Sequence, residues 1–318
     1  MNTVTTPSVT ERPTVSPLNG VATLTHLGVI QVVGEDAAKF IHGQLTQDFS
    51  LLGQDTARLA AFCSAKGRMQ ASFIGFKRGT DEILLVCSRD ILAPTLKRLS
   101  MFVLRAKVRL SDATDAFVLY GLAGDAIKTI AGDAHSAWSR ADFDAATVIN
   151  LYPADATLRQ LYVAPAGSPA PAGAPLSADA WAWGDVRSGV ATVTAPVVEA
   201  FVPQMLNYES VGGVNFKKGC YPGQEVVARS QYRGTLKRRA FVVHADAALA
   251  AGDEVFAADD DSQPVATVVQ AAPAPQGGFD AIISAQLSAV EAGTLHLGAV
   301  GGPTLQVLPL PYALLADV

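Results

Sequence analysis

The sequence has few cysteines and no long hydrophobic run. Its three cysteines lie far apart in the 318-residue chain and form no Cys-x-x-Cys pair. This argues against a disulfide framework and fits a reducing compartment, so we expect a cytoplasmic protein. No apolar stretch has the length of a membrane span, so we expect no membrane partner. Residues 1–20 lack the charged start and apolar middle of a secretion signal, and their composition predicts a disordered tail.

Several common cofactor motifs are also missing. The chain has neither a Walker-type loop nor a Gly-x-Gly-x-x-Gly pattern, so the sequence does not support a nucleotide or dinucleotide cofactor. Its five histidines are scattered without the spacing of metal ligands, and we expect no metal site. Three dispersed cysteines are too few for this chain to hold an iron–sulfur cluster by itself.

Charge is distributed unevenly along the chain. The formal net charge of −5 at pH 7 argues against a general nucleic-acid binder, and we expect no DNA partner. Between residues 217 and 239, however, seven basic residues stand against one acid, Glu225. Such a patch indicates a specific anionic ligand, or alternatively a solvated charged face. The basic residues are Lys217, Lys218, Arg229, Arg233, Lys237, Arg238 and Arg239.

The spacing of apolar residues predicts an α+β fold. A Pro- and Ala-rich stretch at 165–176 predicts an exposed connection between two subdomains of a larger region, residues 21–236. Short strands separated by Gly-rich turns then predict a small β-barrel or sandwich over residues 237–318. Other expected elements are a strand over 21–33, a helix opened by Glu35 and Asp36, a hairpin of 57–63 and 68–76, a helix from Asp90 to about Val103, a short helix near 125–131 and a helix over 178–187.

The most informative stretch is residues 215–234, NFKKGCYPGQEVVARSQYRG, hereafter the cysteine segment. Cys220 follows two lysines and a glycine and precedes a Pro-Gly turn and a predicted helix over 224–231. Nearby lysine charge and the helix N-terminus would both stabilise a thiolate, the reactive form of cysteine. Gly219 and Gly223 would let the backbone approach a ligand closely.

An inert role for the cysteines is the alternative. From the physical argument alone, Cys220 is equally well read as a small buried hydrophobe under a turn. Cys63 and Cys87 lie inside apolar strand patterns, so both are expected in the core.

One motif within the cysteine segment resembles the signature of the YgfZ family. These proteins are folate-binding relatives of the glycine-cleavage T-protein that support iron–sulfur cluster assembly or repair. The resemblance implies a T-protein-like cloverleaf of three small domains around a central hole, with an α+β region, a ferredoxin-like region and a C-terminal β-barrel. Tetrahydrofolate would bind in or near that hole. The matching motif is Lys218-Gly219-Cys220-Tyr221-Pro222-Gly223-Gln224-Glu225, continued by Val227-Ala228-Arg229, and it is supported by Gly43–Asp48, Lys66-Gly67-Arg68 and Phe201–Gln204.

The resemblance also implies roles for single residues. Cys220 would be the functional thiol, and Trp181 and Asn207 would contact folate. By periodicity alone, Trp181 is read equally well as a core aromatic. Leu27 stands where the family has a second folate-contacting tryptophan, which is a departure from the family pattern. The motif residues that would surround the thiol are Lys218, Gly219, Tyr221, Gly223, Gln224, Glu225 and Arg229.

One family feature needed for catalysis is missing. The T-protein transfers an aminomethyl-derived carbon to folate and uses an aspartate just after a Gly-Gly hairpin. The comparable hairpin here, residues 66–71, reads KGRMQA and has no carboxylate, which argues against aminomethyl transfer. The preferred interpretation is therefore a tetrahydrofolate-binding accessory factor, not clearly an enzyme, whose partners are iron–sulfur client proteins and whose effect on tRNA thiolation is indirect. The alternatives are a folate-dependent one-carbon transferase and a module that binds tRNA through the basic patch.

Overall fold

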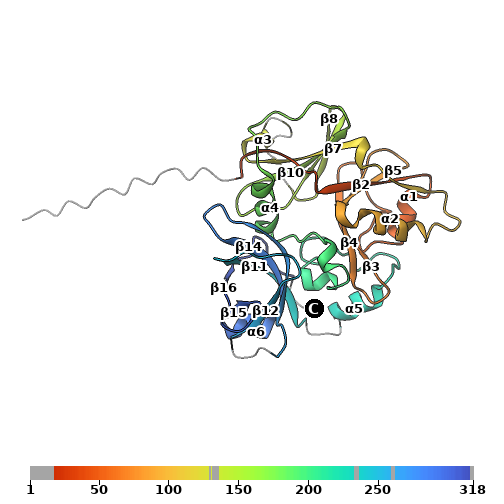
Figure 1. Ribbon diagram of the computed structural model, residues 1–318. Helices are drawn as coiled ribbons and strands as arrows, with labels where there is room; N and C mark the ends of the chain where they lie inside the picture. The colour runs from red at the N-terminus through yellow and green to blue at the C-terminus, as the bar shows by residue number, and fades with distance from the viewer. Residues whose placement is uncertain (1–17, 129, 131–135, 233–235, 259–261, 316–318) are drawn as a thin grey trace, which may run out of the picture.

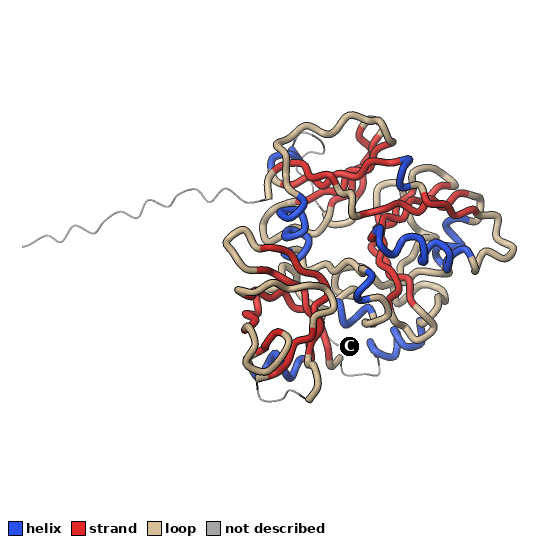
Figure 2. Tube along the Cα trace, in the orientation of Figure 1, coloured by secondary structure: helices blue, strands red, loops and turns tan. Residues whose placement is uncertain are grey.

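The computed structural model shows two open sheets and a closed barrel gathered around a central region (Figure 1). It describes residues 18–128, 130, 136–232, 236–258 and 262–315. Strands make up most of each lobe, and short helices lie on the sheets and between the lobes (Figure 2). The predicted α+β fold is confirmed. No helix in this described part of the chain is long and apolar enough to cross a membrane.

The first sheet is antiparallel, in the order β3-β4-β5-β2-β6. The predicted hairpin is present, because β3 and β4 pair directly with Ala57 opposite Phe76. Two helices pack on this sheet and share its core. Their apolar residues recur at helical spacing, so each helix buries one face. The elements are β2 (Leu27–Val33), α1 (Ala37–His42), β3 (Ala57–Cys63), β4 (Met69–Lys77), β5 (Glu82–Ser88), α2 (Leu92–Ser100) and β6 (Arg109–Asp112).

The second sheet has the order β1-β7-β10-β9-β8 and is also antiparallel. Helix α4 packs beside it and begins at a Ser177 cap whose side chain accepts a hydrogen bond from the Ala180 N–H. The elements are β1 (Gly20–Thr23), β7 (Phe117–Ala123), α3 (Asp125–Lys128), β8 (Arg140–Phe143), β9 (Ala146–Asn150), β10 (Arg159–Pro165) and α4 (Ala178–Arg187). The short helix expected near 125–131 ends at Lys128, and residue 131 lies outside the described residues.

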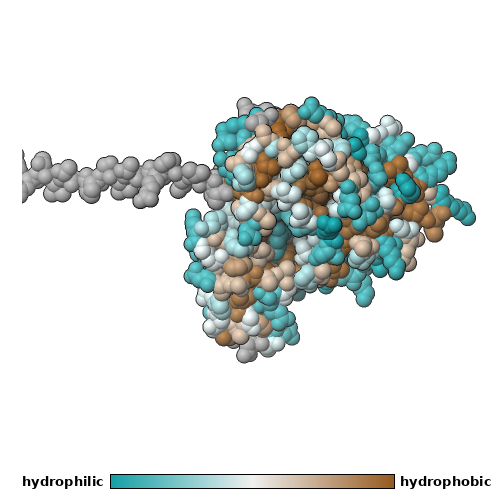
Figure 3. Space-filling model, turned by 45° about the horizontal axis from the view of Figure 1, so that its top comes forward, coloured by the Kyte–Doolittle hydropathy of each residue, from teal (hydrophilic) through white to brown (hydrophobic). Residues whose placement is uncertain are grey.

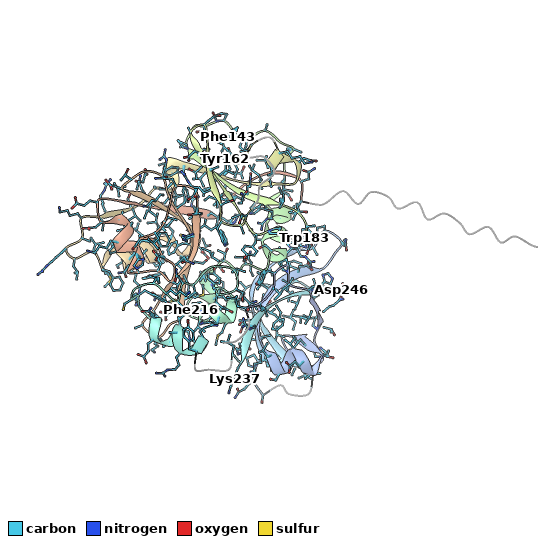
Figure 4. The ribbon with its side chains drawn as sticks, turned by 180° about the vertical axis from the view of Figure 1, so that it is seen from behind. Phe143, Tyr162, Trp183, Phe216, Lys237 and Asp246 are labelled. Carbon is cyan, nitrogen blue, oxygen red and sulfur yellow. The ribbon has the colours of Figure 1, made fainter. Side chains whose placement is uncertain are left out.

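The last lobe is a closed barrel in the order β11-β14-β13-β12-β15-β16, which confirms the predicted β-barrel. Its interior is filled by small and branched side chains that alternate along the strands. Trp183 on α4 lies against this lobe (Figure 4), where its indole Nε1–H donates to Asp280 Oδ2 at 2.8 Å. The elements are β11 (Arg238–Ala245), β12 (Glu254–Ala257), β13 (Ala266–Pro273), β14 (Phe279–Gln286), α6 (Leu287–Ala292), β15 (Leu295–Leu297) and β16 (Thr304–Leu308).

The N-terminal region differs from its expected form. The single strand expected over residues 21–33 is two strands, because β1 pairs with β7 in the second sheet whereas β2 pairs with β5 and β6 in the first. The chain changes sheets at residues 24–26. A disordered tail was expected over residues 1–20, and this is wrong for its last residues. Leu18 is only 1% exposed, and Gly20 begins β1. Residues 1–17 lie outside the described residues.

Asp90 does not cap the helix that was expected to start there. A 3-10 turn covers Arg89–Ile91, and α2 follows from Leu92 to Ser100. The Asp90 carboxylate instead accepts hydrogen bonds from the Ser88 hydroxyl at 2.7 Å and from the Ala195 N–H at 2.8 Å. The prediction failed because an aspartate carboxylate can accept a hydrogen bond from a distant backbone N–H instead of from the first N–H groups of a nearby helix.

The placement of two cysteines in the core is confirmed. Cys63 and Cys87 are both buried in the first lobe. Burial raises the pKa of each thiol to about 12, because the charged thiolate loses its hydration. Neither thiol is therefore a nucleophile under ordinary conditions.

Candidate functional site

Cys220 lies at the surface, in the turn that precedes helix α5 (Gln224–Tyr232). The thiol belongs to an exposed residue, so the alternative of a small buried hydrophobe is wrong. Phe216, from the same segment, lies beside α5 (Figure 4), and its ring meets the ring of Tyr232 at 5.6 Å between centroids. An aromatic contact thus packs the start of the cysteine segment against the end of α5, while Cys220 between them stays exposed.

Lys218 turns inward beneath the cysteine. Its ammonium donates hydrogen bonds to the backbone carbonyls of His42 and, at 2.6 Å, of Leu45. Burial lowers the pKa of Lys218 to about 8, and the charges of Asp48 and Cys220 partly counteract this shift. The interaction with Cys220 places a fixed cation within electrostatic range of the thiol, as the sequence suggested.

Gly223 serves packing rather than the approach of a ligand, which corrects the expectation for this residue. Its φ is +81°, and a β-carbon there would lie 2.4 Å from the Ser64 carbonyl oxygen and 2.7 Å from the Gly67 Cα. Gly67, with φ of +71°, faces Val226 of α5 in turn. The two glycines let the β3–β4 hairpin turn sit directly on the start of α5. The turn that carries Cys220 therefore packs on the β3–β4 hairpin through the backbone of Gly223.

The remaining motif side chains do not form one pocket. Glu225 and Arg229 are exposed and pair with each other at 2.7 Å, which is an ordinary surface ion pair of small energetic value. Gln224 is half-buried, and its backbone N–H donates to the Tyr221 carbonyl at 3.2 Å. Tyr221 is buried, and its ring lies 4.8 Å from the Lys218 ammonium. The expectation that Glu225 and Arg229 shape a pocket for the thiol is not met by this geometry.

A histidine and an aspartate, His42 and Asp48, lie beside the cysteine segment. No role was expected for His42 from the sequence, and Asp48 was named only as the end of the stretch Gly43–Asp48. His42 ends α1, and its Nδ1 lies 3.1 Å from Asp48 Oδ1. Its Nε2 faces Gly219, where a β-carbon would lie 3.3 Å away. Burial pushes the pKa of Asp48 upward, but the hydrogen bond from the Leu51 N–H and the nearby His42 hold it below its usual range.

The spacing of His42 and Asp48 in the sequence did not indicate that they interact. The two residues are six apart, at a helix end and in a loop, a spacing that belongs to no catalytic pattern. Only the tertiary contact between α1 and the cysteine segment brings them beside Lys218 and Gly219.

The basic patch expected over residues 217–239 is not a continuous surface. Arg239 is buried and pairs with buried Glu209 at 2.6 Å. Lys218 is also buried, and Arg229 is neutralised by Glu225. Arg233 lies outside the described residues. The charge count along the chain therefore overstated the cationic surface.

A cavity of about 390 Å³ lies where the two sheets, α4 and the barrel meet. Its walls are largely apolar, and the surface around the lobes mixes hydrophilic and hydrophobic patches (Figure 3). Trp181 lines the cavity and is 2% exposed, so the interpretation as a core aromatic is confirmed, and its contact with folate stays a prediction. Leu27 lines it as well. Other wall residues are Leu59, Ile74, Val86, Trp138, Tyr152 and Leu161.

One charged pair enters this cavity from two elements. Arg159 of β10 and Asp185 of α4 form an ion pair there. The Arg159 guanidinium also lies 4.3 Å from the Trp181 ring, a cation–π contact. Among the described residues, its Nε–H finds no hydrogen-bond partner. The cavity therefore combines largely apolar and aromatic walls with the Asp185 carboxylate, whereas the Arg159 Nε–H is enclosed beside Gly184 and is not exposed to the cavity.

The thiol and the cavity are separate places. None of the residues that line the cavity belongs to the cysteine segment. Asn207, expected to contact folate, does not line it either. Asn207 is fully buried, and its amide donates to the Ala240 carbonyl at 2.9 Å and to the Tyr312 hydroxyl at 3.3 Å. The Asn207 amide thus bonds to β11 of the barrel and to Tyr312 and is enclosed in the protein. This corrects the expectation that Asn207 contacts folate.

Comparison with known proteins confirms the resemblance and the fold. No family model matches the chain. The chain is 29% identical to the tRNA-modifying protein YgfZ of Yersinia pseudotuberculosis serotype O:1b (strain IP 31758), over 91% of each chain. It is 28% identical to the protein of the same name from Cronobacter sakazakii (strain ATCC BAA-894), over 89% of this chain and 90% of the other. The glycine cleavage system aminomethyltransferase T from Bartonella henselae has a similar structure, with a TM-score of 0.62 at 15% identity, covering 94% of this chain and 87% of that one.

Proposed function

We propose that the protein is a tetrahydrofolate-binding accessory factor for the assembly or repair of iron–sulfur clusters in client proteins, acting through Cys220. The observation that carries this proposal is the exposed Cys220 thiol with the buried Lys218 cation behind it. The thiolate form of cysteine is both a nucleophile and a ligand for iron. A cluster in this scheme belongs to the client as cargo.

The separation of the thiol from the cavity favours an accessory factor. A group-transfer enzyme needs its reactive side chain beside the bound cofactor. Here the cavity lies between the lobes, whereas Cys220 faces solvent at the start of α5. A thiol on an outer surface can meet a group held by another macromolecule.

The cavity residues fit a folate. The pyrimidine half of the pterin in tetrahydrofolate is planar, carries N–H donors along one edge and offers carbonyl and nitrogen acceptors. The Asp185 carboxylate lines the cavity and can accept from those donors. Trp181 and Tyr152 supply aromatic wall surface, and Leu27 supplies an aliphatic wall where the family has tryptophan. When bound, the folate would supply one-carbon chemistry or stabilise the arrangement of the lobes.

A folate-dependent aminomethyltransferase is the second candidate, and the similar fold of the Bartonella protein is its support. The hairpin argues against it. Arg68 donates to the Ala200 carbonyl, at 2.5 Å from its Nη1, and Gln70 Nε2 donates to Glu199 Oε1 at 2.6 Å. No hairpin residue from 66 to 71 is an acid. Turnover of tetrahydrofolate with an aminomethyl or N-methyl donor by the purified protein would replace our choice with this one.

The printed name of the relatives connects them with tRNA modification. We propose that this chain affects tRNA indirectly, through client enzymes that depend on iron–sulfur clusters. Direct binding through the basic patch loses support because Lys218 and Arg239 are buried. The test is tRNA affinity as a function of salt, with Lys217→Ala and Lys237→Ala, since both of these lysines are exposed. A steep salt dependence that disappears in the double variant would establish direct binding.

The main experiment replaces Cys220 by Ser, which preserves shape, and by Ala in cells that lack the unaltered protein. The activity of an enzyme with a [4Fe–4S] cluster is then compared with that of an enzyme without a cluster. We expect loss of the first activity only, while the variant proteins remain folded. Normal cluster-enzyme activity with the serine variant would defeat the proposed role of the thiol.

A further inference from the structure

We propose that Trp138 is the residue on which a flat heterocyclic ligand stacks in the cavity between the lobes. The inference rests on the proposed function only for the identity of that ligand, tetrahydrofolate. No role was expected for Trp138 from the sequence. It lies just before β8 and lines the 390 Å³ cavity.

The backbone of Trp138 adopts a conformation that bulky residues rarely take. Its φ is +68°, in the left-handed region. Its N–H donates to the Asn150 carbonyl at 2.8 Å, and its carbonyl accepts from the Ala57 N–H at 2.8 Å. Its indole Nε1–H donates to the Val211 carbonyl, also at 2.8 Å. Strained residues of this kind persist where the surrounding structure fixes them, and they concentrate at functional sites and ligand clamps.

The indole is fixed in place but is not enclosed by protein. Trp138 is only partly buried, and it borders a second hollow of about 250 Å³ as well as the main cavity. The ring of Tyr152 lies 5.8 Å from it between centroids, and Tyr312 packs on Tyr152 at 5.7 Å. A tryptophan that served only the core would be covered on all sides, because protein interiors are close-packed. Trp138 therefore keeps aromatic surface that no protein contact covers.

Trp181, the other tryptophan in the cavity wall, has its ring already covered. It is 2% exposed. A β-carbon at Gly121 would lie 2.4 Å from Trp181 Cε3, so the backbone of β7 packs directly on this ring. The Arg159 guanidinium lies 4.3 Å from the ring centroid. Of the two tryptophans in the wall, Trp138 is thus the one with surface available for stacking.

The cavity also indicates which kind of ring would stack there. Trp138 offers the face of a π system, and the Asp185 carboxylate in the same cavity accepts hydrogen bonds from N–H groups. Together they select a planar nitrogen heterocycle with N–H donors at its edge. In tetrahydrofolate this part is the pyrimidine half of the pterin.

The first test is the tetrahydrofolate affinity of Trp138→Leu and Trp138→Phe, measured by calorimetric titration. Leucine keeps an apolar wall but removes the π face, so the affinity should fall about tenfold, whereas phenylalanine should stay within about threefold of the unaltered protein. Trp183→Leu is the matched control and should bind as the unaltered protein does, because Trp183 is not among the residues that line this cavity. Urea denaturation shows which variants are folded. Unchanged affinity in a folded Trp138→Leu protein would overturn the inference.

A second measurement detects stacking in the unaltered sequence, where a purely structural role of Trp138 would give no signal. Incorporation of 5-fluorotryptophan labels the three tryptophans of the chain, and Trp138→Phe identifies the fluorine resonance of Trp138 by its loss. Saturating tetrahydrofolate should shift the Trp138 resonance and leave that of Trp183 in place. A shift confined to Trp181 would contradict the proposal.

A ligand without the folate tail separates this inference from the proposed function. The probe is 2,4-diaminoquinazoline, a flat heterocycle with N–H donors at its edge. If tetrahydrofolate does not bind the unaltered protein, the folate part of the proposed function fails. A Trp138 resonance that still shifts with the quinazoline would then support the stacking role by itself. If neither compound shifts this resonance, the stacking role is wrong.

Discussion

The ammonium of Lys218 donates a hydrogen bond to the carbonyl of Leu45 at 2.6 Å, joining two segments 173 residues apart in the chain. Because the His42 carbonyl accepts from the same ammonium, one lysine occupies the C-terminal end of α1 and holds the cysteine segment against it. A buried cation bound to neutral carbonyls keeps its charge free to act on Cys220. The motif lysine therefore has a structural and an electrostatic task at once.

Replacing Lys218 by Met should destabilise the fold. The variant keeps the length of the side chain but leaves two backbone carbonyls without their donor, a cost of roughly 1–3 kcal/mol. Lys217→Met is the control, because Lys217 is exposed. Chemical denaturation at neutral pH measures both variants. A Lys218 variant as stable as the control would show that removal of the buried charge offsets the loss of these hydrogen bonds.

The stability difference between the unaltered protein and Lys218→Met should widen as the pH rises from about 8 to 10.5. Within this window the unfolded chain holds a proton on Lys218 that the folded chain has already released. The unfolded state then binds more protons, so the folded protein gains stability with pH, by about 1.4 kcal/mol for each unit of pKa difference. The variant lacks this contribution. Denaturation at several pH values measures the gap, and a gap that stays constant or narrows contradicts the assigned shift.

Gly223→Ala should cost at least about 2 kcal/mol, because it combines a positive φ with a collision against the hairpin backbone. Gly219→Ala is the matched control in the same segment. There a β-carbon meets only the side chain of His42, at 3.3 Å from Nε2 and 4.0 Å from Cδ2, so the free energy of unfolding should change little. Urea denaturation of both variants tests the claim that Gly223 joins α5 to the β3–β4 turn. Equal stabilities would refute it.

Enlarging Ala182 should block the cavity without unfolding the protein. Ala182 lines the cavity from α4 and is only partly buried, so Ala182→Phe places a ring in the cavity that we propose as the folate site. We expect tetrahydrofolate affinity to fall by more than about tenfold, the equivalent of 1.4 kcal/mol. Ala180→Phe on the same helix lies outside the cavity lining and should bind as the unaltered protein does. Unchanged binding by Ala182→Phe would move the folate elsewhere.

Local patterns predicted much of the fold. The β3–β4 hairpin follows from two alternating runs with a Gly-containing turn between them, and the barrel follows from short strands with Gly-rich turns. The helix after Pro222-Gly223 was placed at nearly its observed start. Each of these signals lies within a few residues of the element that it describes.

Features that depend on distant partners were not predictable. The alternation over residues 21–33 continues through the change of sheet, because both strands bury the same kinds of residue. Asp90 is bound by Ala195, more than a hundred residues away, and Gly223 needs its conformation because of Ser64. The position of Cys220 in a turn before a helix was predicted, but the approach of His42 and Asp48 to the cysteine segment depends on the docking of α1.

The central claim is that the folate cavity and the Cys220 thiol are separate sites with separate tasks. Calorimetric titration of Cys220→Ser with tetrahydrofolate, beside the unaltered protein, tests it most directly. The account predicts binding to one site in both proteins with the same affinity, because no residue of the cysteine segment lines the cavity. The absence of binding in both proteins, or a loss of affinity confined to the serine variant, would contradict it.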